Sequence, residues 1–191
     1  MKNIAVFVSG NGSNCENIIR HFAGSKDARV SLVLSNRQDA YALTRTRKYG
    51  ISTEVMPKDC FSNRDKILPL LRKYNTDFIV LAGFLLIIPD FLIKEYNCRI
   101  INIHPSLLPK FGGKGMYGMN VHRAVKEAME KETGITVHYV NEECDGGEII
   151  AQFKTSLTGN ESAEDIAGMV QKLEQAHYPT VIENIIKSSK S

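Results

Sequence analysis

Two kinds of segment alternate along the first two-thirds of the chain. Short runs of apolar and β-branched residues are separated by longer stretches in which apolar positions recur every three or four residues. Runs of the first kind are typical of strands, and stretches of the second kind are typical of amphipathic helices. The predicted strands cover residues 3–8, 30–35, 52–55, 78–82 and 100–103. The predicted helices cover residues 15–23, 40–49, 64–74 and 89–95.

This order of elements predicts an α/β fold. Several of the predicted strands are apolar almost throughout, as in parallel sheets that are covered by helices on both faces. Strands that alternate with helices form right-handed βαβ units. We therefore expect a Rossmann-like, open, mostly parallel twisted sheet flanked by helices.

The pattern changes after Pro109. A glycine-rich stretch, residues 112–119, precedes a predicted helix over residues 121–130. Its glycines suggest a mobile lid, and an extended surface loop explains them equally well. Two strand-like runs, residues 136–140 and 148–154, then predict a hairpin or an antiparallel extension of the sheet.

A long helix is predicted at the C-terminal end, from about Ser162 to Lys187. Ser162 and Asp165 have the spacing of a helix start with an acidic residue in the first turn. Pro179 predicts a kink or a break. No repeat or linker divides the chain, so we expect one domain over residues 1–191.

The composition of the chain indicates no particular class of function. The formal net charge of the 191 residues is only +3 and the basic residues are spread out, so neither nucleic acid nor a membrane is indicated as a partner. No signal peptide or membrane-spanning stretch is recognisable, which favours a soluble cytoplasmic protein. The cysteines are too widely spaced for a disulfide framework or a zinc site and are expected to be reduced thiols. They are Cys15, Cys60, Cys98 and Cys144.

The most informative motif is the segment from Asn102 to Pro109, followed about forty residues later by Asp145-Gly146-Gly147. Asn102 and His104 are two residues apart at the end of an apolar run, so a strand would project both side chains from one face. Ligands of parallel α/β sheets bind at the carboxyl ends of the strands. An amide, an imidazole and a carboxylate there fit an acyl-transfer site. A buried strand end whose polar groups satisfy the backbone is the alternative.

A second candidate site is the loop Ser9-Gly10-Asn11-Gly12-Ser13-Asn14, between the first predicted strand and helix. Glycines let backbone N–H groups approach a ligand, and a helix N-terminus favours an anion. The loop lacks the sixth-position glycine of the dinucleotide fingerprint, where Cys15 stands, and it lacks the Gly-Lys-Ser/Thr of a P-loop. It therefore predicts the binding of one phosphate, with a tight turn capped by Asn14 as the alternative.

Taken together, these segments and Leu81-Ala82-Gly83-Phe84 resemble the folate-dependent formyltransferases. The loop at residues 9–14 and the short chain resemble the phosphoribosylglycinamide formyltransferase (glycinamide ribonucleotide transformylase) branch. The resemblance implies transfer of a formyl group from 10-formyltetrahydrofolate, as co-substrate, to the glycine amine of glycinamide ribonucleotide. The products would be formylglycinamide ribonucleotide and tetrahydrofolate, in de novo purine biosynthesis. The partners expected are these small molecules, and the oligomeric state is left open.

The chemistry of this transfer suits the motif. An amine that attacks a formyl carbon creates a tetrahedral centre whose oxygen becomes negative and needs donors already in place. Asn102 and a protonated His104 can supply them, and Asp145 can assist proton transfer. No covalent intermediate is needed, so Ser106 is interpreted as a loop hydrogen-bonding residue and Cys144 as a packing residue.

The resemblance also implies binding residues. The substrate phosphate would lie on Gly12, Ser13 and Asn14. Arg64 and Glu174 would contact phosphate-side and ribose groups, with plain surface charges as the alternative. The folate would contact Asn102, Asp145, Phe84, Leu85, Leu86, Ile87 and Ile88. Leu86 stands where the family commonly has a basic residue, which puts a side-chain contact to folate at that position in doubt. We expect the N-terminal half to bind the nucleotide and the C-terminal half to bind folate and carry the catalytic residues.

The other histidines are ambiguous. His138 alternates with apolar residues on a predicted strand, where it either helps to position the site or is an ordinary strand histidine. Glu174 and His177 share a helix face, but one pair makes no metal site, and no metal is predicted. Three rival functions remain open at this point: another formyltransferase, a hydrolase that releases formate from 10-formyltetrahydrofolate, and a nucleotide-binding module without catalysis.

Overall fold

A computed structural model describes residues 1–189 of the chain. Its contacts divide the chain into two compact units. The first unit comprises Met1–Ile101 with the described residues from Ile182 onward, and the second comprises Asn102–Val181. The single domain expected from the sequence stays a prediction.

The sheet has seven strands in the order β3-β2-β1-β4-β5-β6-β7. In the first unit, β1 pairs in parallel with β2 and β4, and β2 pairs in parallel with β3. The predicted α/β fold with an open, mostly parallel sheet is confirmed. The strands that begin in this unit are β1 (Lys2–Val8), β2 (Ala28–Ser35), β3 (Ser52–Val55), β4 (Phe78–Leu81) and β5 (Ile100–His104).

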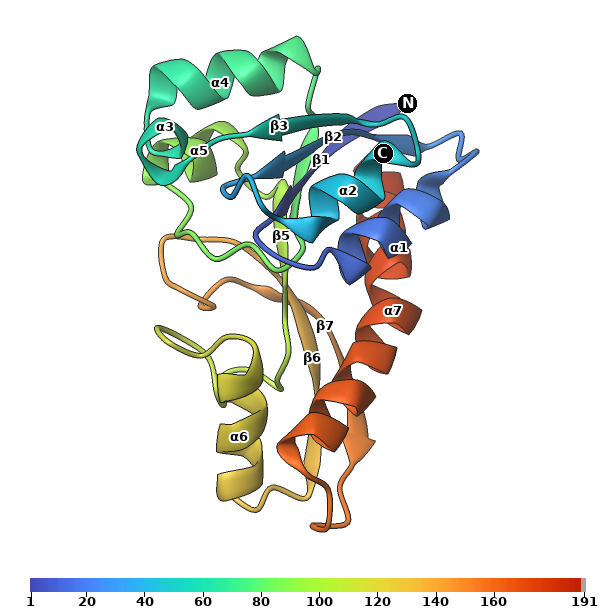
Figure 1. The fold of residues 1–191 in the computed structure, drawn as a ribbon, viewed down its shortest axis with the longest axis vertical. Helices are drawn as coiled ribbons and strands as arrows, with labels where there is room; N and C mark the ends of the chain where they lie inside the picture. The colour runs from blue at the N-terminus through green and yellow to red at the C-terminus, as the bar shows by residue number, and fades with distance from the viewer. Residues whose placement is uncertain (190–191) are drawn as a thin grey trace. The chain divides into compact units, whose positions relative to one another are not determined.

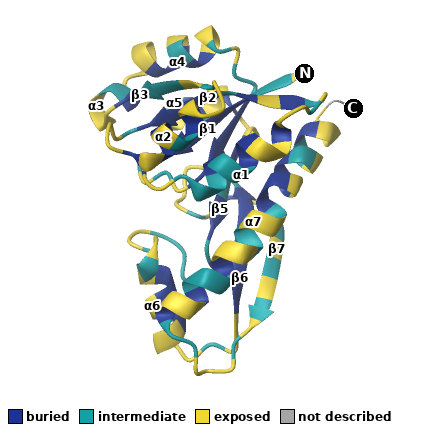
Figure 2. Cartoon of the chain, turned by 45° about the vertical axis from the view of Figure 1, so that its right-hand side comes forward, coloured by how far each residue is buried: buried dark blue, intermediate teal, exposed yellow. Residues whose placement is uncertain are grey.

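The helices of the first unit form two groups. α1 packs beside α2, while α3 and α5 both pack beside α4 (Figure 1). The side chains from Ile4 to Val8 are fully buried, so β1 is the centre of the core of this unit (Figure 2). The short helix α3 was not predicted. The helices are α1 (Ser13–Phe22), α2 (Tyr41–Arg47), α3 (Lys58–Phe61), α4 (Arg64–Lys73) and α5 (Asp90–Glu95).

The second unit contains the end of β5, helix α6 (Met119–Glu127) and the strands β6 (Glu132–Tyr139) and β7 (Ile149–Ser156). β6 and β7 pair antiparallel, which confirms the predicted hairpin. The side chains of neighbouring residues of β7 point to opposite faces of the sheet. The Gln152 side chain donates to the Leu108 carbonyl at 2.9 Å, whereas the Phe153 ring stacks on His177 at 3.8 Å. The hairpin therefore lies between the segment that follows β5 and helix α7.

Helix α7 (Ala163–Ser188) begins as predicted. The Ser162 hydroxyl accepts from the Asp165 amide at 3.0 Å, and the Asp165 carboxylate accepts from the Ser162 amide at 2.9 Å. The helix continues through Pro179, so the predicted break is wrong, and the alternative of a kink stays a prediction. A proline inside a helix costs about 3 kcal/mol, and burial of the adjacent Tyr178 and of Val181 offsets this cost. Within residues 1–189, no helix is both long and apolar enough to span a membrane.

Candidate active site

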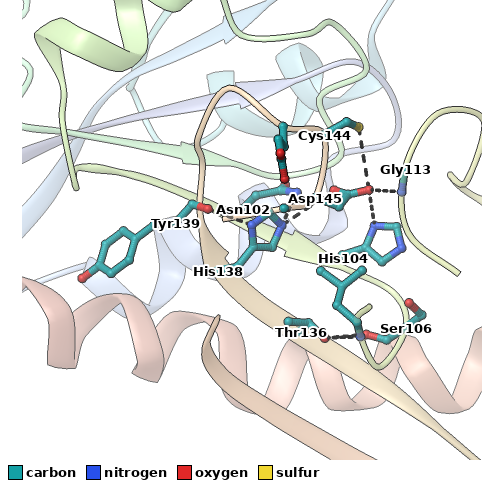
Figure 3. A network of polar contacts seen from close by, with 12 residues as sticks. Asn102, His104, Ser106, Gly113, Thr136, His138, Tyr139, Cys144 and Asp145 are labelled. Carbon is teal, nitrogen blue, oxygen red and sulfur yellow. Dashed lines mark hydrogen bonds and ion pairs between the residues drawn. The ribbon is translucent and has the colours of Figure 1, made fainter. Parts of the chain in front are cut away.

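Asn102 and His104 lie two residues apart on β5, so they share one face of the strand, as the sequence predicted. The His104 side chain is buried and Asn102 is half-buried. The Asn102 amide nitrogen lies 3.1 Å from Nε2 of His138, which comes from β6 (Figure 3). His138 thus belongs to the site, although its alternation with apolar residues did not distinguish it from an ordinary strand histidine.

His138 determines how the Asn102 amide is oriented. Its Nδ1 lies 2.9 Å from the Tyr139 carbonyl, which can only accept, so Nδ1 carries the proton. Burial lowers the pKa of His138, and the nearby His104 lowers it further, although the Tyr139 carbonyl and Asp145 oppose the shift. The ring is therefore neutral at pH 7, and its Nε2 accepts one N–H of Asn102. The strand register shifts between Val137 and His138, and such irregularities re-aim side chains beside active sites.

His104 has an acceptor at each ring nitrogen. Its Nε2 donates to the Phe111 carbonyl at 2.7 Å, and its Nδ1 lies 3.4 Å from Oδ2 of Asp145 (Figure 3). The ring is only 4% exposed, so neither contact is replaced by bulk solvent. The ring thus lies between a backbone carbonyl and a carboxylate, one at each nitrogen.

Asp145 lies in the turn that joins β6 to β7, with a positive φ of 57°. Its Oδ2 accepts from the Gly113 amide at 3.0 Å, and its Oδ1 lies 3.7 Å from Nε2 of His138. Gly147 explains part of the Asp-Gly-Gly motif, because a Cβ there would lie 1.6 Å from the Tyr139 carbonyl oxygen. The turn closes only with glycine at this position, and this closure places the carboxylate beside both histidines.

Cys144 corrects one expectation. The sequence suggested a packing residue, but the side chain is exposed and its Sγ lies 3.8 Å from Oδ2 of Asp145. Partial desolvation and the adjacent carboxylate raise the pKa of the Cys144 thiol, which leaves less of the nucleophilic thiolate at neutral pH. All four cysteines are free thiols in the structure.

A hydrogen-bonded network holds the segment that follows β5. The Thr136 hydroxyl donates to the Ser106 carbonyl at 2.7 Å and accepts from the Leu108 amide at 3.0 Å. The Ser106 hydroxyl donates to the Lys110 carbonyl at 2.7 Å, which agrees with its predicted loop role. These contacts lead the backbone directly to Phe111, whose carbonyl meets His104.

The predicted phosphate loop lies in the first unit. Gly12 has a φ of 78° and precedes the first residue of α1, so this helix starts without a capping side chain. A Cβ on Gly12 would lie 2.4 Å from Cβ of Ala42, which explains the need for glycine. Ser13 and Asn14 form the first turn of α1, directly after Gly12.

Arg64 is the first residue of α4 and is exposed, so its placement agrees with either the substrate contact or the surface charge considered from the sequence. Glu174 is half-buried on α7 in the second unit. Complete burial, together with the charge of Glu174, raises the pKa of Tyr178 well above its usual range. The Glu174 carboxylate therefore acts electrostatically on a core tyrosine.

The residues expected to contact folate alternate between buried and exposed positions. Phe84 packs against Phe7 and Phe61, with ring centroids 5.4 and 5.0 Å apart. Ile88 is buried and Leu86 is half-buried. Leu85 and Ile87 are 55% and 81% exposed, so they offer apolar surface to a ligand. The Leu85 amide already donates to the Ser9 hydroxyl at 2.9 Å.

The structure thus brings Asn102, His104 and Asp145 together in the second unit. The predicted phosphate loop, Arg64 and the segment 84–88 belong to the first unit. Sequence reasoning missed the Phe111 carbonyl and the Gly113 amide. Within residues 1–189, no group of three or more metal-ligating side chains is placed to hold an ion.

Known proteins resemble this chain over most of its length. A model of the formyl transferase family matches residues 2–182. A chloroplastic phosphoribosylglycinamide formyltransferase of Arabidopsis thaliana is 42% identical over 95% of the chain, and that of Escherichia coli strain K12 is 39% identical over 94%. The chain spans 64% of the length of the Arabidopsis protein and 85% of that of the Escherichia protein.

Solved structures of proteins with this name also match the fold of the chain. A crystal structure of phosphoribosylglycinamide formyltransferase from Anaplasma phagocytophilum matches with a TM-score of 0.88 and 33% identity. The match covers 98% of this chain and 88% of that one. These comparisons confirm the resemblance drawn from the motifs, and the chain belongs to the formyl transferase family.

Proposed function

We propose that this protein transfers the formyl group of 10-formyltetrahydrofolate to the glycine amine of glycinamide ribonucleotide, in purine biosynthesis. The observation that carries the proposal is the cluster in which Asp145 faces the buried His104 and the buried His138 orients Asn102. Relatives that bear the name phosphoribosylglycinamide formyltransferase support the choice of substrates. The Bacillus subtilis relative is 37% identical, and the match covers 97% of this chain and 95% of that protein.

Asn102 is the donor that stabilises the oxyanion. One N–H of its amide is held by neutral His138, which fixes the side chain, and the second N–H donates to the oxygen of the tetrahedral intermediate. A donor that is already oriented needs no rearrangement when the charge develops. His138 is accordingly a positioning residue that acts through Asn102.

His104 adds the second donor, and this role requires an exchange of partners. Its Nε2 is hydrogen-bonded to the Phe111 carbonyl. The formyl oxygen replaces this carbonyl as the acceptor, so the backbone around Phe111 moves when the formyl group arrives. Gly112 and Gly113 follow directly and give this part of the loop the freedom to do so.

Asp145 assists the proton transfer. The attacking amine must lose a proton and the departing folate nitrogen must gain one. The carboxylate lies 3.4 Å from Nδ1 of His104 and is only partly exposed, so it can accept a proton directly or through one water. No step forms a covalent enzyme intermediate.

The substrates are held by the residues that the sequence indicated. Backbone amides at Gly12, Ser13 and Asn14 bind the phosphate of the nucleotide, since α1 starts there without a capping side chain. Arg64 and Glu174 contact phosphate-side and ribose groups. The exposed Leu85 and Ile87 give the folate an apolar surface.

The test is a turnover assay with purified protein and 10-formyltetrahydrofolate, with and without glycinamide ribonucleotide, followed by the spectroscopic signal of tetrahydrofolate. Turnover that depends strictly on the nucleotide supports the proposal. Release of formate without the nucleotide would identify a hydrolase instead. Nucleotide binding without turnover would leave only a binding module and refute the transfer.

A further inference from the structure

The predicted phosphate loop is held from outside by one arginine on α2. The Nε of Arg45 donates to the Asn11 carbonyl at 3.0 Å, and its Nη2 donates to Oδ1 of Asn11 at 3.3 Å. The guanidinium also lies over the Tyr41 ring, 5.0 Å from its centroid, which limits its rotation. Arg45 thus fixes the residue that immediately precedes Gly12.

The same guanidinium binds Glu16, which lies in the first turn of α1. Nη1 of Arg45 donates to Oε2 of Glu16, and the Tyr49 hydroxyl donates to Oε1 at 3.0 Å. The hydrogen bond from Arg45, followed by that from Tyr49, lowers the pKa of Glu16. The carboxylate is therefore ionised at neutral pH, with its charge beside the helix end that is proposed to bind a phosphate.

A carboxylate in this turn creates an electrostatic conflict. The N-terminus of a helix attracts any anion, so Glu16 competes for the same positive potential that would hold the phosphate. Two like charges near one another also repel. The Arg45 and Glu16 side chains are only 27% and 21% exposed, so solvent screens this repulsion incompletely.

We propose that Arg45 is a positioning residue for phosphate binding, which fixes the loop through Asn11 and neutralises Glu16 so that the loop accepts an anion. This inference rests on the proposed function, since it assumes that the phosphate of the nucleotide lies at Gly12–Asn14. It adds a residue outside the loop and assigns an electrostatic role to a pair of charged side chains.

The experiment compares Arg45→Met, Glu16→Gln and the double variant by steady-state kinetics. Arg45→Met should raise the KM for glycinamide ribonucleotide at least about tenfold, while the KM for folate and kcat change less than about threefold. Glu16→Gln in the Arg45→Met background should recover most of this loss, because the uncompensated charge is then gone. If Arg45 only holds the loop together, removal of the Glu16 charge should not restore the KM for the nucleotide.

Arg47→Met is the matched control. Arg47 is an exposed arginine on the same helix, so its removal changes the net charge equally. Its KM for the nucleotide should stay within about twofold of the wild type. An unchanged nucleotide KM in Arg45→Met, or a loss of the same size in the Arg47 control, would overturn the inference. Failure of Glu16→Gln to rescue would overturn the electrostatic role.

Two further measurements keep the inference testable. Where Arg45→Met does not fold, Arg45→Lys is measured instead. It keeps a cation near Glu16 but loses the paired hydrogen bonds to Asn11, so the KM of this variant for the nucleotide should rise several-fold. An unchanged value would overturn the positioning role. Calorimetric binding of the nucleotide alone separates this inference from the proposed reaction. Weaker binding by Arg45→Met supports it even if the wild type shows no turnover, and equal binding overturns it.

Discussion

Replacement of Asp145 by asparagine is the most direct test of the site. The asparagine side chain has nearly the shape of the carboxylate. Its oxygen can still accept the hydrogen bond from the Gly113 backbone N–H, which in the wild type is 3.0 Å long. The turn should therefore form normally. The variant loses the negative charge 3.4 Å from Nδ1 of His104 and the group that accepts a proton.

The expected size of the effect follows from these losses. Positioned proton transfer contributes about 100-fold to 10,000-fold in rate, so kcat should fall at least about 100-fold, or about 2.7 kcal/mol in transition-state free energy. The KM values for nucleotide and folate should stay within about threefold, because the lost contact acts in the transition state.

The assay is steady-state formation of tetrahydrofolate, with the melting temperature measured in parallel to verify folding. Glu142→Gln is the control, since Glu142 is an exposed carboxylate three residues earlier in the same turn. Its kcat should equal that of the wild type. A kcat in Asp145→Asn within about threefold of the wild type would refute the role of this carboxylate in proton transfer.

Four further results are expected. Ser13→Asp should raise the KM for the nucleotide far more than that for folate, and equal effects would mean that the phosphate binds elsewhere. His138→Phe should lower kcat about tenfold or more, because Asn102 loses the acceptor that orients it; a normal kcat would refute the positioning role. The free energy of unfolding, measured in urea, should be highest above about pH 6.5 and fall as the pH drops, because burial lowers the pKa of both His138 and His122 in the folded state and the unfolded chain takes up their protons first. His122→Asn should flatten that fall, and an unchanged slope between pH 7.5 and 5.5 would contradict this cause. Ser162→Ala should destabilise the protein by about 1 kcal/mol through loss of the cap of α7, against no measurable change if the cap is unimportant.

The sequence predicted the parts of the site that depend on local geometry. Asn102 and His104 share a face because strand side chains repeat every two residues, and this held as soon as the strand was recognised. The capped start of α7 likewise depends only on Ser162 and Asp165, three residues apart. Both predictions required one element and no knowledge of its neighbours.

Contacts between distant elements were beyond this reasoning. His138 lies beside Asn102 because of strand pairing and a register shift at Val137. The alternation of apolar residues predicts neither of these. Pro179 fails to break α7 for a related reason. The local rule gives its cost correctly, but burial of Tyr178 and Val181 decides the outcome, and burial depends on the whole fold.

The backbone contacts of the site have the same physical origin, and they connect its architecture to its chemistry. A buried imidazole and a largely buried carboxylate each need hydrogen-bond partners, because an unsatisfied polar group in a protein interior costs about 1–3 kcal/mol. The Phe111 carbonyl and the Gly113 amide supply them for His104 and Asp145. Every residue type has a backbone carbonyl and every type except proline has a backbone N–H, so no side-chain pattern marks these groups. In the proposed mechanism, a formyl oxygen that binds His104 competes with this hydrogen bond of 2.7 Å, so the energy of moving the glycine-rich segment after Phe111 would enter the energetics of the reaction.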